Sequence, residues 1–263
     1  MSLMDIKAKI EAFEKRQKNI AIAYGGDGEI LKVIKQTDGK KAIIPFRNYA
    51  LCDEHANRLE NFLNHKSEQK DLAMTRCPFI EWKKVFLDDV DTVSGNKMKM
   101  FVPAVSSAGE NIKGKGIAEI AIKSADITEA LRFNVYVDDK LYLKNVISDG
   151  AIVSTVYGAT GYFKSIARCI FNGSNIGIAF IAPTQGINNL ILDCKSRIRF
   201  EFLRNFEIVV SADKTYQRLN VSRNECIEVS EIPDAVSIFG LSEFHCFKCR
   251  EKRHSVVENG NVI

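Results

Sequence analysis

The chain has 263 residues, of which 46% are hydrophobic and 27% are charged, and its formal net charge is +4. This composition is typical of globular proteins, and the length suffices for one large domain or two smaller ones. The small net charge argues against a nucleic-acid-binding protein, and no apolar run is long enough to span a membrane. The seven cysteines are scattered and odd in number, which favours reduced thiols in a cytoplasmic protein.

Helical and strand patterns alternate over residues 1–75. Apolar residues at helical spacing predict a helix over 5–16, and a short apolar run predicts a strand over 19–24. A second pair of patterns predicts a helix over 29–35 and a buried strand over 41–46. We therefore expect a short α/β domain over residues 1–75.

Strand patterns dominate the remainder of the chain. They predict a larger, mainly β domain over residues 76–263, whose C-terminal helix we expect to pack back on the first domain. Its one other conspicuous helix is expected over 161–171, and the basic residues 113–115 are expected to form a solvated turn. The predicted strands are 79–87, 97–102, 116–122, 133–137, 141–146, 177–181, 197–202, 207–211 and 225–229.

The first chemically informative run is Gly25-Gly26-Asp27-Gly28, between a predicted strand and a predicted helix. Backbone N–H groups of such a turn and helix start can hold phosphate oxygens. The carboxylate of Asp27 can take a proton from a hydroxyl group or hold a water of Mg²⁺. This pairing suits phosphoryl transfer. Taken alone, the run fits a tight turn with a helix-capping aspartate equally well.

The second informative run covers residues 149–162, Asp-Gly-Ala-Ile-Val-Ser-Thr-Val-Tyr-Gly-Ala-Thr-Gly-Tyr. It again places small and polar residues where an apolar strand ends and a helix begins. Nucleotides bind at strand ends of this kind in α/β proteins, so two of them predict a cleft with a wall on either side. Taken singly, Tyr162 fits a core aromatic residue, and Asp149 fits a solvated strand end.

In this order, the two runs resemble the motifs of the NAD kinase family. Members of that family read Gly-Gly-Asp-Gly-Thr in the first place, and Asp-Gly followed by Ser-Thr-Pro-Thr-Gly-Ser-Thr-Ala-Tyr in the second. Ala118-Glu119 resembles the family's Asn-Glu strand motif, and Asn48 resembles its Asn-x-Gly turn. Residues 236–250 resemble its closing strand and helix. The resemblance covers most of residues 19–253 and implies the two-domain architecture shared by NAD kinases and diacylglycerol kinases.

The resemblance implies transfer of the γ-phosphoryl group of ATP to the 2′-hydroxyl of the adenosine ribose of NAD, giving NADP. Asp27 would be the catalytic base, and the glycines would bind phosphates: Gly25, Gly26 and Gly28. The dinucleotide pocket would be lined by Asn48, Glu119, Asp149, Thr160, Gly161, Tyr162 and Ser165.

The physical roles of these side chains are consistent with that assignment. The ring of Tyr162 can stack on a nucleotide ring, and the carboxylates of Glu119 and Asp149 can accept hydrogen bonds from ribose hydroxyls or an amide. Thr160 can cap the helix that is expected to begin at residue 161. The family further implies Mg²⁺ bound with ATP rather than at a dedicated protein metal site, and assembly as a homodimer or homotetramer.

Several residues depart from the family pattern, and Val156, Tyr157 and Gly161 do so within the second run. Ala118 replaces an asparagine, Glu29 replaces a threonine, and Ile147 stands where an arginine is often found. A carboxylate at position 29 suits the helix dipole but would repel a triphosphate unless a cation intervenes.

Two other functions therefore stay open. Lipid kinases related to diacylglycerol kinase share the Gly-Gly-Asp-Gly run, so the same fold could phosphorylate another hydroxyl substrate, a lipid or a sugar. A nucleotide-binding protein that has lost catalysis is the second alternative. The carboxylate of Asp27 argues against it, because a protein that only binds nucleotides has little need of that group.

Overall fold

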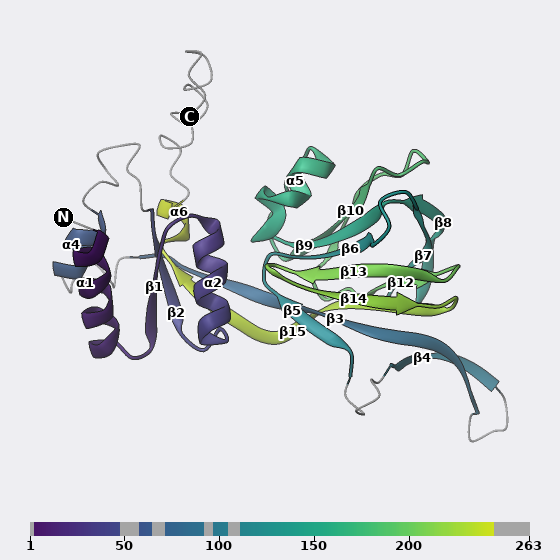
Figure 1. Ribbon diagram of the computed structural model, residues 1–263, viewed down its shortest axis with the longest axis horizontal. Coiled ribbons are helices and arrows are strands. Elements are labelled where there is room, and N and C mark those ends of the chain that lie inside the picture. The colour runs from purple at the N-terminus through teal and green to yellow at the C-terminus, as the bar shows by residue number, and fades with distance from the viewer. Residues whose placement is uncertain (1–2, 48–57, 65–71, 92–96, 105–110, 245–263) are drawn as a thin grey trace, which may run out of the picture. The chain divides into compact units, whose positions relative to one another are not determined.

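The computed structural model describes residues 3–47, 58–64, 72–91, 97–104 and 111–244 (Figure 1). The protein is mostly β, with a small α/β part near its N-terminus. Contacts between residues divide the chain into two compact units. The first unit is Met1–Cys77 with Ala235–Ile263, and the second is Pro78–Asp234. The long strands β3 (Met74–Asp91) and β15 (Glu225–Phe239) each begin in one unit and end in the other.

The first unit is built on two parallel strands, β1 (Ile20–Tyr24) and β2 (Ala42–Phe46). The end of β15 joins them in parallel through Ile238, which pairs with Ile43 of β2. Among the described residues, the helices of this unit are α1 (Leu3–Arg16), α2 (Asp27–Thr37), α4 (Arg58–Asn64) and the short α6 (Leu241–Phe244).

Alternation along β1 explains how helices cover both faces of these strands. Ile22 belongs to a buried cluster that includes Phe13 of α1 and Phe62 of α4. The intervening residues, Ala21 and Ala23, point to the opposite face. Their small side chains leave room for α2, and Figure 1 shows α1 and α2 on either side of the strand pair.

The second unit contains two antiparallel β layers. One is a six-stranded sheet in the order β11-β10-β9-β6-β13-β14. In the other, β12 pairs with β7 and with the first part of β15, β7 pairs with β8, and β3 pairs with β4 and β5. The bounds are β4 (Lys97–Pro103), β5 (Lys113–Gly116), β6 (Glu119–Ser124), β7 (Leu131–Val137), β8 (Lys140–Ser148), β9 (Gly150–Thr155), β10 (Asn175–Ile181), β11 (Leu190–Asp193), β12 (Ile198–Phe202), β13 (Phe206–Ala212) and β14 (Thr215–Val221).

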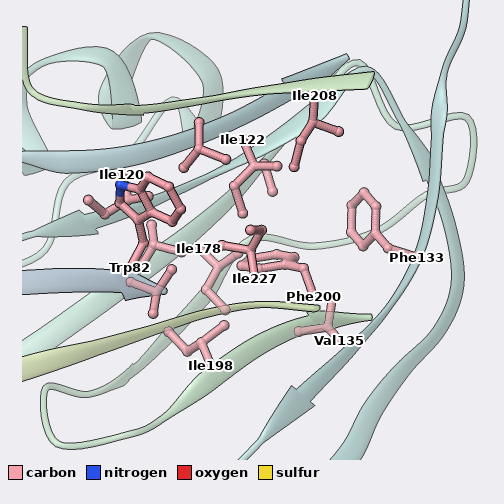
Figure 2. Packing of buried hydrophobic residues seen from close by; sticks show 14 of the residues in the cluster. Trp82, Ile120, Ile122, Phe133, Val135, Ile178, Ile198, Phe200, Ile208 and Ile227 are labelled. Carbon is pink, nitrogen blue, oxygen red and sulfur yellow. The ribbon is translucent and has the colours of Figure 1, made fainter. Parts of the chain in front are cut away.

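The main hydrophobic core of this unit lies between the two layers (Figure 2). Ile120 and Ile122 project into it from β6, and Phe200 projects from β12. Trp82 of β3 is also buried there, at 1% exposure. Every second residue of these strands enters the core, so the intervening residues of β6 lie on the opposite face of the six-stranded sheet.

Several sequence predictions need correction. The strand predicted over 116–122 is two strands, β5 and β6, interrupted at residues 117–118. The basic residues 113–115 belong to β5 and not to a turn. The structure also contains β11 and β14, which the sequence pattern did not reveal, and β15 continues ten residues beyond the predicted end at 229.

The predicted helices differ mainly at their ends. Helix α2 begins at Asp27, two residues before the predicted start. The helix expected over 161–171 is a 3₁₀ turn, η2 (Gly158–Thr160), followed by the short α5 (Tyr162–Ala167). Arg168 has a left-handed backbone with φ 58°, which ends α5 there.

Candidate functional site

The Gly-Gly-Asp-Gly run lies where β1 ends and α2 begins. The N–H of Gly25 donates to the carbonyl of Phe46 at 2.8 Å, and Gly26 precedes the helix with an extended backbone. Asp27 is the first residue of α2, and its side chain is 56% exposed. The start of α2 therefore presents backbone N–H groups and a carboxylate at the carboxyl end of a buried strand.

The two glycines before Asp27 differ in how much space a side chain would have at each position. A Cβ atom at Gly25 would lie 2.9 Å from the Cβ of Glu29, so the first turn of α2 leaves no room for a side chain there. A Cβ atom at Gly26 would lie 3.8 Å from Nη1 of Arg47, an ordinary contact. Gly25 is thus required by the packing of α2, whereas the position of Gly26 has space beside it.

Arg47 is a residue of this site that the sequence analysis did not identify. It follows β2 directly, and its Nη1 lies 3.6 Å from Oδ2 of Asp27. The carboxyl ends of adjacent parallel strands meet at one edge of a sheet, so a basic residue after β2 was a usable signal. The nearby Glu29 pairs with Lys32, at 3.1 Å between Oε1 and Nζ. Each carboxylate in the first turn of α2 therefore has a cation beside it.

In the second unit, Asp213 holds the segment that carries the Ala-Glu motif. Its Oδ2 accepts the N–H of Ile117 at 2.9 Å, and its Oδ1 accepts the N–H groups of Ala118 at 2.9 Å and Glu119 at 3.3 Å. The N–H of Asp213 in turn donates to the carbonyl of Glu119 at 3.1 Å. This arrangement interrupts the strand between β5 and β6 and fixes the backbone of Glu119.

The turn after β9 holds the same segment from the other side. The Thr155 hydroxyl donates to the carbonyl of Ile117 at 2.5 Å, and the N–H of Thr155 donates to the carbonyl of Ala118 at 2.9 Å. A Cβ atom at Gly158 would lie 2.2 Å from that Ala118 carbonyl oxygen. The structure thus joins the Ala-Glu motif to the Ser-Thr-x-x-Gly motif, although they are far apart in the sequence.

The remaining residues of this motif surround the start of α5. Thr160 ends the 3₁₀ turn, and Gly161 occupies the N-cap position with no side-chain cap hydrogen bond. The prediction that Thr160 caps this helix is therefore wrong. The Ser165 hydroxyl donates to the carbonyl of Tyr162 at 2.8 Å, and both Thr160 and Ser165 are exposed.

Tyr162 lies beside a second basic residue that the sequence analysis missed. The Nζ of Lys123 lies 4.6 Å from the centroid of the Tyr162 ring, a cation–π contact. Residues 119 and 123 are four apart on β6, so they lie on the same face of the sheet. That face is opposite the core that contains Ile120, and it therefore brings Glu119, Lys123 and Tyr162 to one side of the second unit.

The carboxyl group of Glu119 is unusually easy to protonate. Burial raises its pKa from 4.5 to about 7, with a further contribution from the neighbouring Asp213 carboxylate, while Lys123 acts in the opposite direction. Burial also raises the pKa of Asp213, against the effect of its three backbone hydrogen bonds. A nucleotide that contacts Glu119 would meet a group that changes charge near neutral pH.

Asp149 lies exposed between β8 and β9. Its N–H donates to the carbonyl of Ile181 at 3.0 Å, and its carbonyl accepts the N–H of Ser124 at 3.1 Å. These backbone bonds leave the side chain at the end of β8 and in solvent. Asn48, the other residue assigned to the dinucleotide pocket, lies outside the described residues.

In the part of the chain that the structure describes, no group of three or more histidine, cysteine, aspartate or glutamate side chains is arranged to hold a metal ion. No helix in the same residues has the length and apolar character needed to cross a membrane.

Comparison with known proteins gives relatives of one kind. No family model matches the chain. The chain is 23% identical over 239 residues to an NAD kinase of Pasteurella multocida, in an alignment that covers 89% of this chain and 72% of that protein. It is 29% identical over 158 residues to NAD kinase 2 of Bacillus licheniformis, covering 59% of this chain and 50% of that protein. The chain thus spans about half to three quarters of these two relatives.

The fold is also similar to that of a solved structure. The crystal structure of yeast NADH kinase complexed with NADH superposes with a TM-score of 0.65 at 14% sequence identity. The match covers 93% of this chain and 67% of the yeast chain. At this identity the match shows that the two proteins share a fold.

Proposed function

We propose that the chain transfers the γ-phosphoryl group of ATP to the 2′-hydroxyl of the adenosine ribose of NAD, because it is similar to NAD kinases over most of its length. The products are NADP and ADP. The observation that carries this proposal is the half-exposed carboxylate of Asp27 at the start of α2, with backbone N–H groups beside it. This combination supplies both a proton acceptor and a phosphate-binding element.

In the proposed reaction, the 2′-oxygen of NAD forms a bond to the γ-phosphorus of ATP. The bond between that phosphorus and the bridging oxygen breaks, and ADP leaves. The proton of the 2′-hydroxyl passes to the carboxylate of Asp27. Gly25, Gly26 and Gly28 would let phosphate oxygens approach the backbone closely, and the positive end of the α2 dipole would attract these oxygens.

The site also suits Mg²⁺ that arrives with ATP. Mg²⁺ prefers oxygen ligands and keeps several waters, and the Asp27 carboxylate is exposed enough for a hydrated ion to reach it. Such an ion would neutralise charge on the phosphate groups when bound. The carboxylates in the first turn of α2 are those of Asp27 and Glu29, and their oxygens would accept hydrogen bonds from the waters of such an ion.

We assign the dinucleotide to the second unit's exposed face around α5. Glu119 would accept a hydrogen bond from a ribose hydroxyl or amide, and Tyr162 would stack on a ring. The exposure of their neighbours supports the assignment, since these residues can reach a ligand: Asp149, Thr160, Gly161 and Ser165. The family resemblance alone supports Asn48 as a further residue of the dinucleotide pocket and assembly as a homodimer or homotetramer. A cytoplasmic location is proposed from the scattered, odd-numbered cysteines.

The proposal is tested by measuring NADP formation from NAD and MgATP with the native chain and with Asp27→Asn. We expect turnover by the native chain. In the variant we expect a loss of about 10²-fold or more in kcat, because general acid–base catalysis typically contributes 10²–10⁴-fold. Binding of NAD and ATP, measured by calorimetry, should change little.

Asp38→Asn is the matched control, since Asp38 lies at the other end of α2 and is exposed. Its backbone is left-handed, with φ 50°, a conformation that asparagine adopts readily. This variant should keep native turnover. Binding of both nucleotides without turnover by the native chain would instead identify a nucleotide-binding protein, and turnover of ATP only with another alcohol would identify a kinase of different specificity.

A further inference from the structure

Arg47 is a buried cation at the carboxyl end of β2. Its side chain is 6% exposed, whereas the side chain of its partner Asp27 is 56% exposed. A buried guanidinium group is costly unless charged and polar neighbours compensate it. The position of Arg47 therefore requires an explanation beyond solvation at a strand end.

A rigid platform holds the guanidinium group in place. The Cζ of Arg47 lies 3.8 Å from the ring centroid of Phe244, and its Nε donates to the carbonyl of Phe244 at 3.3 Å. Phe244 is 1% exposed and lies 197 residues later in the chain. Its own N–H donates to the carbonyl of Gly240 at 3.0 Å, and Gly240 donates to the carbonyl of Ala73 at 2.9 Å.

This platform aims the rest of the guanidinium group at the start of α2. With the Nε bonded to Phe244 and the plane stacked on its ring, Nη1 is directed to the Asp27 carboxylate at 3.6 Å and lies near the position of Gly26. A planar fork stacked on an aromatic ring is already ordered, which a flexible lysine ammonium group is not. The chemistry of this arrangement depends on arginine rather than on positive charge alone.

We propose that Arg47 is a positioning residue that acts through Asp27. It orients the carboxylate that receives the hydroxyl proton, and its charge offsets the accumulation of negative charge where a triphosphate meets the first turn of α2. This inference rests on the proposed function and assigns to its reaction a residue outside the motifs discussed above. Helix α6, which carries Phe244, thereby supports the catalytic carboxylate through Arg47.

The test compares Arg47→Lys and Arg47→Ala in the NADP-forming assay, with thermal unfolding of each variant. We expect Arg47→Lys to fold and to have a kcat that is lower by about tenfold or more. Its KM for NAD should differ from that of the native chain by less than about threefold. Arg47→Ala should lose more. Added guanidinium or methylguanidinium ions should restore part of the kcat of Arg47→Ala, and ammonium ions at the same concentration should not.

Arg58→Lys is the matched control, because Arg58 also lies over an aromatic ring of the first unit, 5.8 Å from the centroid of Phe46. It should keep native kcat. Native kcat in Arg47→Lys, or loss of folding in both Arg47 variants, would overturn the positioning role and leave an ordinary structural arginine. An inactive native chain would refute the proposed function, and the role of Arg47 with it, so the two failures are distinguishable.

A second measurement tests whether Arg47 acts through Asp27. The effect of Arg47→Lys on kcat should shrink at least threefold when it is introduced into Asp27→Asn, because the carboxylate that it orients is then absent. Equal effects in both backgrounds would show that Arg47 acts independently of Asp27 and would overturn the proposal.

Discussion

Asp213 and Glu119 are joined by two hydrogen bonds, one to the Asp213 side chain and one between backbone groups. The Asp213 carboxylate accepts the N–H of Glu119 at 3.3 Å, and the N–H of Asp213 donates to the Glu119 carbonyl at 3.1 Å. The same carboxylate also accepts the N–H groups of Ile117 and Ala118. One side chain from the end of β13 thus substitutes for a strand partner and fixes the segment to which we assign nucleotide binding.

We expect Asp213→Asn to destabilise the second unit. An asparagine retains only one acceptor oxygen for three N–H donors, and its NH₂ group would face an N–H. A loss of about 2 to 4 kcal/mol in the free energy of unfolding should follow, measured by urea denaturation. NAD binding should also weaken because Glu119 loses its anchor.

Asp138→Asn provides the control for this substitution. Both aspartates have a left-handed backbone, with φ 50° at Asp213 and φ 48° at Asp138, so asparagine introduces no backbone strain at either position. The exposed Asp138 accepts the N–H of Arg197 at 2.9 Å. Its replacement should cost less than about 1 kcal/mol. Similar losses in the two variants would contradict the anchoring role of Asp213.

The raised pKa of Glu119 should make stability depend on pH. The folded protein retains the Glu119 proton up to about pH 7, whereas the unfolded chain releases it near the ordinary pKa of 4.5. Between these values the folded state binds more protons, so the free energy of unfolding should fall as the pH rises from about 4.5 to about 7. The partly exposed position limits this contribution to the order of 1 to 3 kcal/mol.

Glu119→Gln isolates this contribution because glutamine does not titrate. The free energy of unfolding of the native chain and of the variant is measured by denaturation between pH 4 and 8. As the pH rises to 7, the native chain should lose stability relative to the variant. Curves that remain parallel over this range would show that Glu119 titrates normally. The divergence should also be smaller when both proteins carry Asp213→Asn, since the Asp213 carboxylate contributes to the raised pKa.

The sequence predicted those parts of the fold that depend on local pattern. The buried runs at β1 and β2 and the apolar spacing of α1 and α2 reveal their elements directly, because burial of one face imposes a period on the sequence. The break between β5 and β6 has no such signal. It depends on the carboxylate of Asp213, which reaches Ile117 from 96 residues away.

The same limit applies to the candidate site. The glycines and Asp27 stand out because they form a compact run, and the structure places that run at the expected strand end. The pairing of Arg47 with Phe244 brings together residues that are 197 positions apart. No spacing rule connects them, so only the tertiary structure reveals that Arg47 stacks on Phe244 and pairs with Asp27.

Gly158 supplies the last prediction, because the turn after β9 has no space for a larger residue. A Cβ atom there would lie 2.2 Å from the Ala118 carbonyl oxygen and 2.7 Å from Oγ of Ser154. Gly158→Ala must therefore push the turn away from the segment that carries Glu119, at a cost of about 2 kcal/mol or more in unfolding free energy. Gly186→Ala should be nearly neutral, since a Cβ atom at Gly186 meets nothing within 4 Å. If the two substitutions have the same effect on urea denaturation and on NAD affinity, close packing between the two motifs does not maintain the nucleotide-binding face.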